Sequence, residues 1–211
     1  NLGVNIQLGR TKTVRRAYGI DEIALVPGGR TVDPEITKTN WEIGGIQRDI
    51  PIIASAMDGV VDVKMALALS NLGALGVLNL EGIQTRYDDP EEVLTKIQSV
   101  GKEGFVPLMQ EIYKQPIKEE LISKRIQEIK KGGGIAAVSG TPLAAIKYKE
   151  LVKESEADLF FLQATVVSTE HLGKEGSQNL DLYDLCQNIG LPVAVGNCVT
   201  YEVSLKLMRA G

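Results

Sequence analysis

Short apolar segments that end in polar residues recur five times along this chain, at intervals long enough to hold a helix. They occupy residues 50–58, 75–80, 135–138, 159–162 and 191–195. Buried parallel strands read as nearly continuous apolar runs, whereas half-exposed strands alternate between apolar and polar residues. Because consecutive parallel strands need a long crossover, usually a helix, the pattern predicts one parallel sheet with helices between its strands.

Helix-start signals lie between the predicted strands. A capping side chain is often followed by proline, since proline has no amide hydrogen to leave unpaired in the first helical turn. Such pairs occur at Asp89 and Pro90, at Gln115 and Pro116, and at Thr141 and Pro142. A further helical pattern at residues 62–72 stops at Gly73. The chain therefore predicts an α/β fold in which strands and helices alternate.

Polar residues at the ends of the apolar segments are the candidate site. In parallel α/β folds the carboxyl ends of the strands meet at one edge of the sheet, and ligands bind there. The residues at these ends are Ser55, Met57, Asp58, Asn79, Glu81, Ser139, Thr141, Gln163, Thr165 and Asn197. We expect them to form one binding edge.

Composition excludes several classes of protein. The chain has 211 residues, of which 44% are hydrophobic and 24% are charged, as in ordinary soluble domains. The net charge of −4 comes from interspersed acidic and basic residues, so we expect no nucleic-acid partner. The apolar runs are too short for a membrane helix and the N-terminus has no apolar leader, so we expect no membrane partner and a cytoplasmic location.

The residues that usually carry nucleophilic or metal chemistry are sparse. The two cysteines, Cys186 and Cys198, have no metal-ligand spacing, and Cys198 is expected to be an inert buried thiol. The single histidine, His171, lies in a polar segment at residues 166–179 and is expected at the surface. The sequence therefore predicts neither a catalytic triad nor a metal site.

Right-handed crossovers lead either to an open doubly wound sheet or to a closed eight-stranded barrel. Five βα units favour the open sheet by count. However, the chain begins without methionine and stops where a sixth strand is expected, so both ends are interpreted as edges of a fragment. No Gly-X-Gly-X-X-Gly loop follows the first predicted strand, which argues against a dinucleotide-binding open sheet.

Three motifs, in order, resemble the IMP dehydrogenase and GMP reductase family. They are ASAMD at residues 54–58, LGALGVLN at 72–79 and VGNCVT at 195–200, and YGIDEIALVPG at 18–28 is similar to the family's segment ahead of the barrel. The resemblance implies a (β/α)8 TIM barrel as a single domain. Residues 1–49 are then an N-terminal extension and lead-in, and residues 50–211 are βα units one to five. Because residues 80–134 leave no room for inserted CBS domains, the chain is most similar to the branch that lacks them.

The resemblance also implies roles for individual residues. Ser55 and Met57 match positions that contact a purine nucleotide, and Asn197 matches an asparagine beside both the nucleotide and the nicotinamide ribose of NAD. Gln163 and Thr165 lie where the family contacts that ribose. Gln163 departs from the family, which has an aspartate there, and Leu80 and Glu81 stand near positions where the dehydrogenases carry paired histidines.

The reaction implied is the NAD-dependent oxidation of IMP to XMP in guanine nucleotide biosynthesis, performed by a homotetramer. In the family a nucleophilic cysteine on the loop after the sixth strand attacks the purine, and a potassium site lies on a neighbouring loop. Both are expected downstream of Gly211, so no catalytic residue is expected in this chain, which would be inactive by itself. A GMP reductase and a purine-nucleotide-binding barrel without catalysis remain alternatives.

Overall fold

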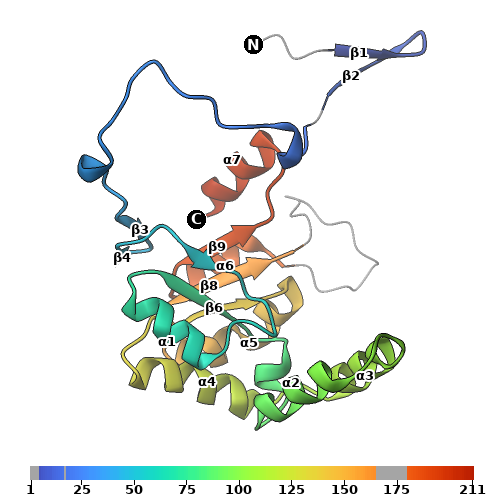
Figure 1. Ribbon diagram of the computed structural model, residues 1–211, viewed down its shortest axis with the longest axis vertical. Helices are drawn as coiled ribbons and strands as arrows, with labels where there is room; N and C mark the ends of the chain where they lie inside the picture. Colours follow the sequence, from blue (N-terminus) through green and yellow to red (C-terminus); the bar gives the residue numbers. More distant parts are fainter. Residues whose placement is uncertain (1–4, 17, 165–179) are drawn as a thin grey trace. The chain divides into compact units, whose positions relative to one another are not determined.

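The apolar segments form one five-stranded parallel sheet, as predicted. The computed structural model describes residues 5–16, 18–164 and 180–211. The strands are β5 (Ile53–Ala54), β6 (Leu75–Asn79), β7 (Ala137–Gly140), β8 (Leu159–Gln163) and β9 (Val193–Gly196). They pair in chain order, each neighbour parallel to the last, and the sheet curls while helices line one of its faces (Figure 1). The α/β class and the curled parallel sheet are confirmed.

Helices connect the strands. They are α1 (Val63–Asn71), α2 (Pro90–Ser99), α3 (Lys102–Lys114), α4 (Glu119–Lys131), α5 (Pro142–Glu154), α6 (Leu182–Asn188) and α7 (Tyr201–Ala210), with a 3-10 turn, η3 (Ile83–Thr85), after β6. The segment between β6 and β7 thus contains η3 and three helices. Within the described part of the chain, no helix is long and apolar enough to cross a membrane.

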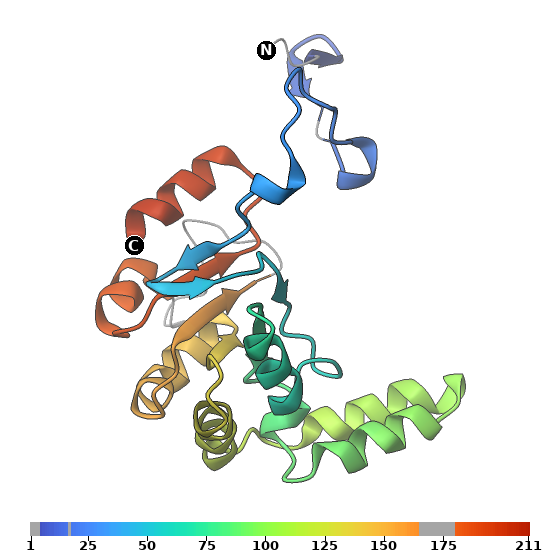
Figure 2. The same cartoon turned by 60° about the vertical axis from the view of Figure 1, so that its left-hand side comes forward.

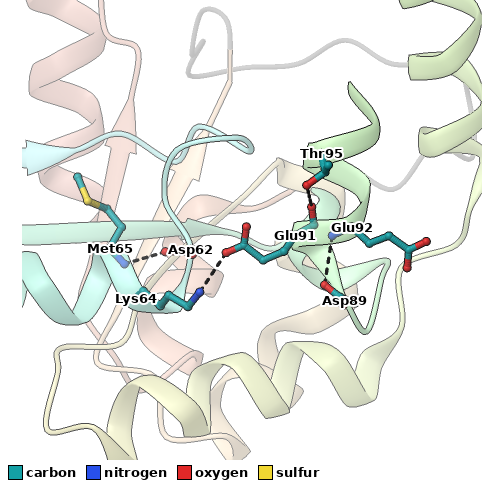
Figure 3. Close-up of polar contacts among 7 residues, drawn as sticks. All are labelled: Asp62, Lys64, Met65, Asp89, Glu91, Glu92 and Thr95. Atoms are coloured by element: carbon teal, nitrogen blue, oxygen red, sulfur yellow. Dashed lines mark hydrogen bonds and ion pairs between the residues drawn. The ribbon is translucent and has the colours of Figure 1, made fainter. Parts of the chain in front are cut away.

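Side-chain caps start α1 and α2. Asp62 accepts a hydrogen bond from the backbone N–H of Met65 at 2.7 Å, and Asp89 does the same for the N–H of Glu92 at 3.2 Å. A salt bridge of 3.1 Å joins Lys64 of α1 to Glu91 of α2, so the two helix starts are linked (Figure 3). Each cap satisfies an amide that has no partner inside its own helix.

The cap expected at Thr141 is confirmed, but the one expected at Gln115 is wrong. Thr141 accepts from the N–H of Ala144 at 3.3 Å, at the start of α5. Gln115 instead follows the last residue of α3, and α4 begins only at Glu119. Pro116 therefore separates two helices, because the residue before a proline is pushed out of the helical conformation.

The main core lies between the convex face of the sheet and the helices. It is built from side chains on β6, β7, β8, α4, α5 and α6, among them Leu78, Val138, Phe160, Ile126, Ile129, Val152 and Leu185. Phe160, Leu78, Ile126 and Ile129 are fully buried. This packing holds the strands in place and leaves their carboxyl ends to carry the polar residues.

A β-hairpin that the sequence analysis did not predict covers part of the other face. Strands β3 (Trp41–Ile43) and β4 (Ile46–Arg48) pair antiparallel. Gly44 and Gly45 join them with φ of 56° and 83°, the signature of a type I′ turn. The available signal was Gly-Gly directly after the alternating tripeptide Trp41–Ile43. The hairpin packs against Leu75, Val77, Ala137 and Leu159 of the sheet.

The chain divides into two units, Asn1–Lys38 and Thr39–Gly211. The first contains an antiparallel hairpin, β1 (Asn5–Leu8) and β2 (Lys12–Arg15), and two 3-10 turns, η1 (Ile20–Glu22) and η2 (Pro34–Ile36). All the elements of the parallel sheet belong to the second unit. That residues 1–211 act as a single barrel domain with an extension stays a prediction.

Candidate functional site

The concave face of the sheet changes from apolar to polar along its three central strands, β6, β7 and β8. Successive side chains of a strand point to opposite faces, so residues two apart share a face. On β6, Leu75 and Val77 contact the β3–β4 hairpin, and Asn79 follows on the same face. The same alternation on the next two strands places Ser139 and Gln163 on this face. The hairpin thus covers the apolar amino ends, and a polar layer remains at the carboxyl ends.

Hydrogen bonds join this polar layer across strands. The hydroxyl of Ser139 on β7 donates to Oε1 of Gln163 on β8 at 3.1 Å. Asn79 accepts from the backbone N–H of Glu81 at 2.9 Å, which shapes the turn leaving β6. Ser139 is buried while Gln163 is exposed, so the buried hydroxyl orients an amide that solvent or a ligand can reach.

Asp58 connects the turn after β5 to the segment after β6. Its Oδ1 accepts from the N–H of Ile83 at 2.8 Å, at the start of η3. Its Oδ2 accepts from the hydroxyl of Tyr113 on α3. Ser55 and Met57, on the same turn, are exposed, and Met57 is 53% accessible to solvent. An exposed methionine on a turn fixed by a carboxylate offers apolar surface to a ligand without being needed for the core.

Asn197 follows β9 at the other edge of the sheet. Its backbone N–H donates to the carbonyl of Ala164 at 3.1 Å, and the N–H of Ala164 donates to the carbonyl of Gly196 at 2.9 Å. These bonds extend the β8–β9 ladder beyond both strands and place Gln163 and Asn197 on neighbouring strand ends. The next residue, Cys198, is exposed, so the expectation of a buried thiol is wrong. The chain leaves the sheet before Cys198, and its side chain therefore has no layer to pack into.

The predicted site residues are partly brought together. Gln163 and Asn197 follow adjacent strands, whereas Ser55 and Met57 follow β5, which is separated from β9 by three strands in the sheet order. All four stand at carboxyl strand ends. Thr165 lies outside the described residues, as does the segment at 166–179. That Ser55, Met57 and Asn197 surround one nucleotide stays a prediction.

Sequence reasoning missed Tyr113, the partner of Asp58. Tyr113 lies in the helix at residues 102–114, and an aromatic residue in a helix is usually interpreted as a packing residue. Burial, and the hydrogen bond and charge of Asp58, raise the pKa of Tyr113 above its ordinary value, so the phenol remains a neutral donor at neutral pH. No motif signals such a pair, because 55 residues separate its members.

The chemistry of the described edge is that of binding. The exposed side chains of Ser55, Met57, Gln163 and Asn197 provide a hydroxyl, a thioether and two amides, which suit ribose hydroxyls and the face of a base. Within residues 5–16, 18–164 and 180–211, no three histidine, cysteine, aspartate or glutamate side chains are grouped closely enough to hold a metal ion.

A curled parallel sheet with helices on its convex face and polar residues at its carboxyl ends defines a ligand-binding α/β protein of the barrel type. Comparison with known families makes the assignment specific. A model described as the IMP dehydrogenase / GMP reductase domain matches residues 17–211, so the chain belongs to this family of oxidoreductases.

Individual relatives agree with this assignment. A crystal structure of an IMP dehydrogenase/GMP reductase-like protein from Corynebacterium glutamicum superposes with a TM-score of 0.88 at 28% identity, covering 98% of this chain and 55% of that one. An uncharacterized oxidoreductase from Mycobacterium leprae is 30% identical over 98% of this chain and 56% of its own length. An inosine-5'-monophosphate dehydrogenase from Methanocaldococcus jannaschii is 34% identical over 48% of this chain and 19% of its own length. The chain spans about half the length of the oxidoreductases it matches over its whole extent.

Proposed function

We propose that the complete protein is an NAD-dependent oxidoreductase of the IMP dehydrogenase type, which oxidises IMP to XMP. One observation carries the proposal beyond family membership. The ASAMD and VGNCVT motifs both begin in the last residues of a strand, β5 and β9, of one sheet, and Ser55, Met57 and Asn197 are exposed just beyond these strands. Such ends are where barrel enzymes bind their substrates.

Ser55 and Met57 are proposed to contact the nucleotide. The Ser55 hydroxyl is able to donate to and accept from a ribose or phosphate oxygen, and the flexible thioether of Met57 provides an apolar surface for the purine. Both residues are exposed on a turn held by Asp58. Asn197 would contribute an amide from the opposite side of the barrel mouth, because the strand ends of a closed barrel surround a common centre.

Gln163, Thr165 and Asn197 are proposed to hold the nicotinamide ribose of NAD. The described pair fits this group, because amides donate and accept hydrogen bonds and Gln163 is exposed and oriented by Ser139. NAD would supply the hydride acceptor for the reaction. Gln163 carries no charge, so its bond to a ribose is expected to be weaker than that of a carboxylate.

The remaining parts of the proposal concern the complete protein. A nucleophilic cysteine and a potassium site would lie outside residues 1–211, and a closed (β/α)8 barrel would complete the five βα units seen here. We further propose a cytoplasmic homotetramer without CBS domains. The residues of this chain would then supply binding and positioning, and the rest of the barrel would supply the covalent chemistry.

The test is spectrophotometric. Full-length protein mixed with IMP and NAD should produce NADH, and omission of IMP should abolish the signal. Consumption of NADPH in the presence of GMP would instead identify a GMP reductase. Absence of both activities with ample enzyme would overturn the proposal.

A second candidate is a purine-nucleotide-binding barrel without catalysis. The observation in its favour is Gln163, which is neutral where the dehydrogenases have a carboxylate. The Oε1 of Gln163 also accepts a hydrogen bond from the Ser139 hydroxyl. This alternative predicts that calorimetry detects IMP binding while no NADH forms at any enzyme concentration. Restoring the carboxylate with Gln163→Asp would then leave the protein inactive.

A further inference from the structure

Helices α2 and α3 form an antiparallel pair that projects from the rest of the second unit, and we name residues 90–114 the α2–α3 arm (Figures 1 and 2). The arm packs largely on itself and on η3. Its core contains Val93, Leu108 and Ile112 with Ile83 of η3. Phe105 and Val106, near the start of α3, are exposed. The arm is joined to the body at one end only, through the start of α2 and the carboxyl end of α3.

Three side chains fasten this end of α3. Arg86 donates to the carbonyl of Glu81 at 3.2 Å and 3.1 Å and to the carbonyl of Gln115, and its guanidinium lies 5.4 Å from the centre of the Tyr113 ring. The Tyr87 hydroxyl donates to the carbonyl of Ile112 at 3.1 Å. The third fastening is the hydroxyl of Tyr113, which donates to Asp58.

Of the three, only the bond from Tyr113 reaches the turn after β5. Arg86 and Tyr87 bind carbonyl groups of the arm and of the segment after β6. Asp58, in contrast, directly follows Met57 and lies on the turn in which the carbonyl of Met57 accepts from the amides of Val60 and Val61, both at 3.0 Å. A change at Tyr113 therefore acts on the residues proposed to contact the nucleotide.

The Asp58 carboxylate has little freedom to find another arrangement. Its Oδ1 is held by the N–H of Ile83, and a Cβ placed on Gly82 would lie 1.4 Å from that oxygen. Only glycine permits this approach. The carboxylate is thus clamped between the segment after β6 and α3, and each of its oxygens has a separate donor. Loss of one donor leaves the charge half satisfied and the turn free to move.

We propose that Tyr113 is a positioning residue: through its hydrogen bond to Asp58 it fixes the turn that carries Ser55 and Met57, and so couples the α2–α3 arm to the purine-nucleotide site. The nucleotide part of this inference rests on the function proposed above. The coupling between Tyr113 and the turn after β5 does not depend on that function, and it is measured separately by amide hydrogen exchange.

The test uses Tyr113→Phe in the full-length protein, which keeps the ring beside Arg86 and removes only the hydroxyl. Tyr87→Phe is the matched control, because it removes a tyrosine hydroxyl that also holds the end of α3, through the carbonyl of Ile112, without touching Asp58. Calorimetry with IMP should show binding about 3- to 10-fold weaker in Tyr113→Phe, the range for one lost hydrogen bond, and changed less than about 2-fold in Tyr87→Phe. Equal effects of the two variants would overturn the proposal.

Amide hydrogen exchange gives a reading that needs no nucleotide. The amides of Met57, Val60 and Val61 report on the turn. Their exchange should accelerate in Tyr113→Phe and stay unchanged in Tyr87→Phe. If the wild type does not bind IMP, the proposed function fails while this measurement still decides the coupling, and unchanged exchange in Tyr113→Phe would refute it.

A double-mutant cycle tests whether Tyr113 and Asp58 act through one bond. Asp58→Asn retains an acceptor for the N–H of Ile83 but removes the charge that faces Tyr113. Tyr113→Phe should then accelerate exchange of the turn amides less in the Asp58→Asn background than in the wild type, because the two residues act through one bond. Fully additive effects would show that Tyr113 acts by another route.

Discussion

The carboxylate of Glu81, just beyond β6, accepts hydrogen bonds from both the backbone N–H and the hydroxyl of Thr141, at 2.6 Å and 3.1 Å. Thr141 is the N-cap of α5, and its own hydroxyl oxygen accepts from the N–H of Ala144. A negative side chain therefore stands at the positive end of a helix and ties the end of β6 to the start of the helix after β7.

Glu81→Ala should lower the free energy of unfolding by about 1–2 kcal/mol, because it removes two acceptors and leaves the Thr141 amide to water. Urea denaturation measures the change. Glu81→Gln should cost less, about 0.5–1 kcal/mol, since one oxygen remains to accept from the amide while the charge at the helix end is lost. The exposed Glu150 on α5 is the control, and Glu150→Ala should stay within about 0.5 kcal/mol of the wild type.

Gly82→Ala should destabilise the protein by about 2 kcal/mol or more. The new methyl group would overlap Oδ1 of Asp58. To escape the clash the carboxylate would have to move, which would break the bond from the Ile83 N–H to Oδ1 and the bond from the Tyr113 hydroxyl to Oδ2. Gly59→Ala tests the same turn without the clash, because its Cβ would meet Leu94 at an ordinary 3.8 Å. Similar urea midpoints for the two variants would contradict the close packing of Asp58 on Gly82.

Met57→Ala should separate binding from stability. More than half of the residue's surface is exposed, so its removal should change the unfolding free energy by less than about 1 kcal/mol. If Met57 covers the purine, IMP binding measured by calorimetry should weaken about 10-fold, as expected for loss of an apolar side chain from an interface. Met208→Ala, at the far end of α7, should leave IMP affinity unchanged. If Met57→Ala binds IMP with the affinity of the wild type, Met57 does not contact the nucleotide.

Gln163→Ala should raise the KM for NAD about 3- to 10-fold and leave the KM for IMP nearly unchanged, because one neutral hydrogen bond to the ribose is lost. Ser139→Ala should act in the same direction but less, since it frees the Gln163 amide without removing it. Gln127→Ala is the control: its amide donates to the carbonyl of Ser155 at 2.9 Å, on the helical side of the sheet. Steady-state kinetics distinguishes the three variants, and a rise in the KM for IMP alone would contradict the assignment.

Cys198 should react with iodoacetamide at least about 10-fold faster than Cys186, because Cys198 is exposed whereas burial raises the pKa of the Cys186 thiol and so lowers its thiolate fraction. IMP should slow the reaction of Cys198, which adjoins Asn197, and leave that of Cys186 unchanged. Peptide mapping by mass spectrometry follows each cysteine separately. If IMP does not change the labelling rate of Cys198, the nucleotide binds elsewhere.

Elements with strong local signals were predictable. The strands at Leu75–Asn79 and Leu159–Gln163 follow from continuous apolar runs, and the helix at Pro90–Ser99 follows from the cap at Asp89 and the proline after it. Each signal depends on residues a few positions apart. The predicted helix start at Gln115 was wrong for the same reason, since a local capping pattern does not reveal whether a helix ends or begins there.

The sequence by itself determined the alternation of strands and helices, the family, and the polar residues at the strand ends, because apolar periodicity and capping act over short stretches of chain. The tertiary structure alone decided which of these polar residues meet. Glu81 and Thr141 are 60 residues apart and Asp58 and Tyr113 are 55 apart, and their pairing depends on strand register and on how α3 docks. Hydrogen bonds between distant side chains leave no periodic trace, since they form only after packing has fixed the backbone.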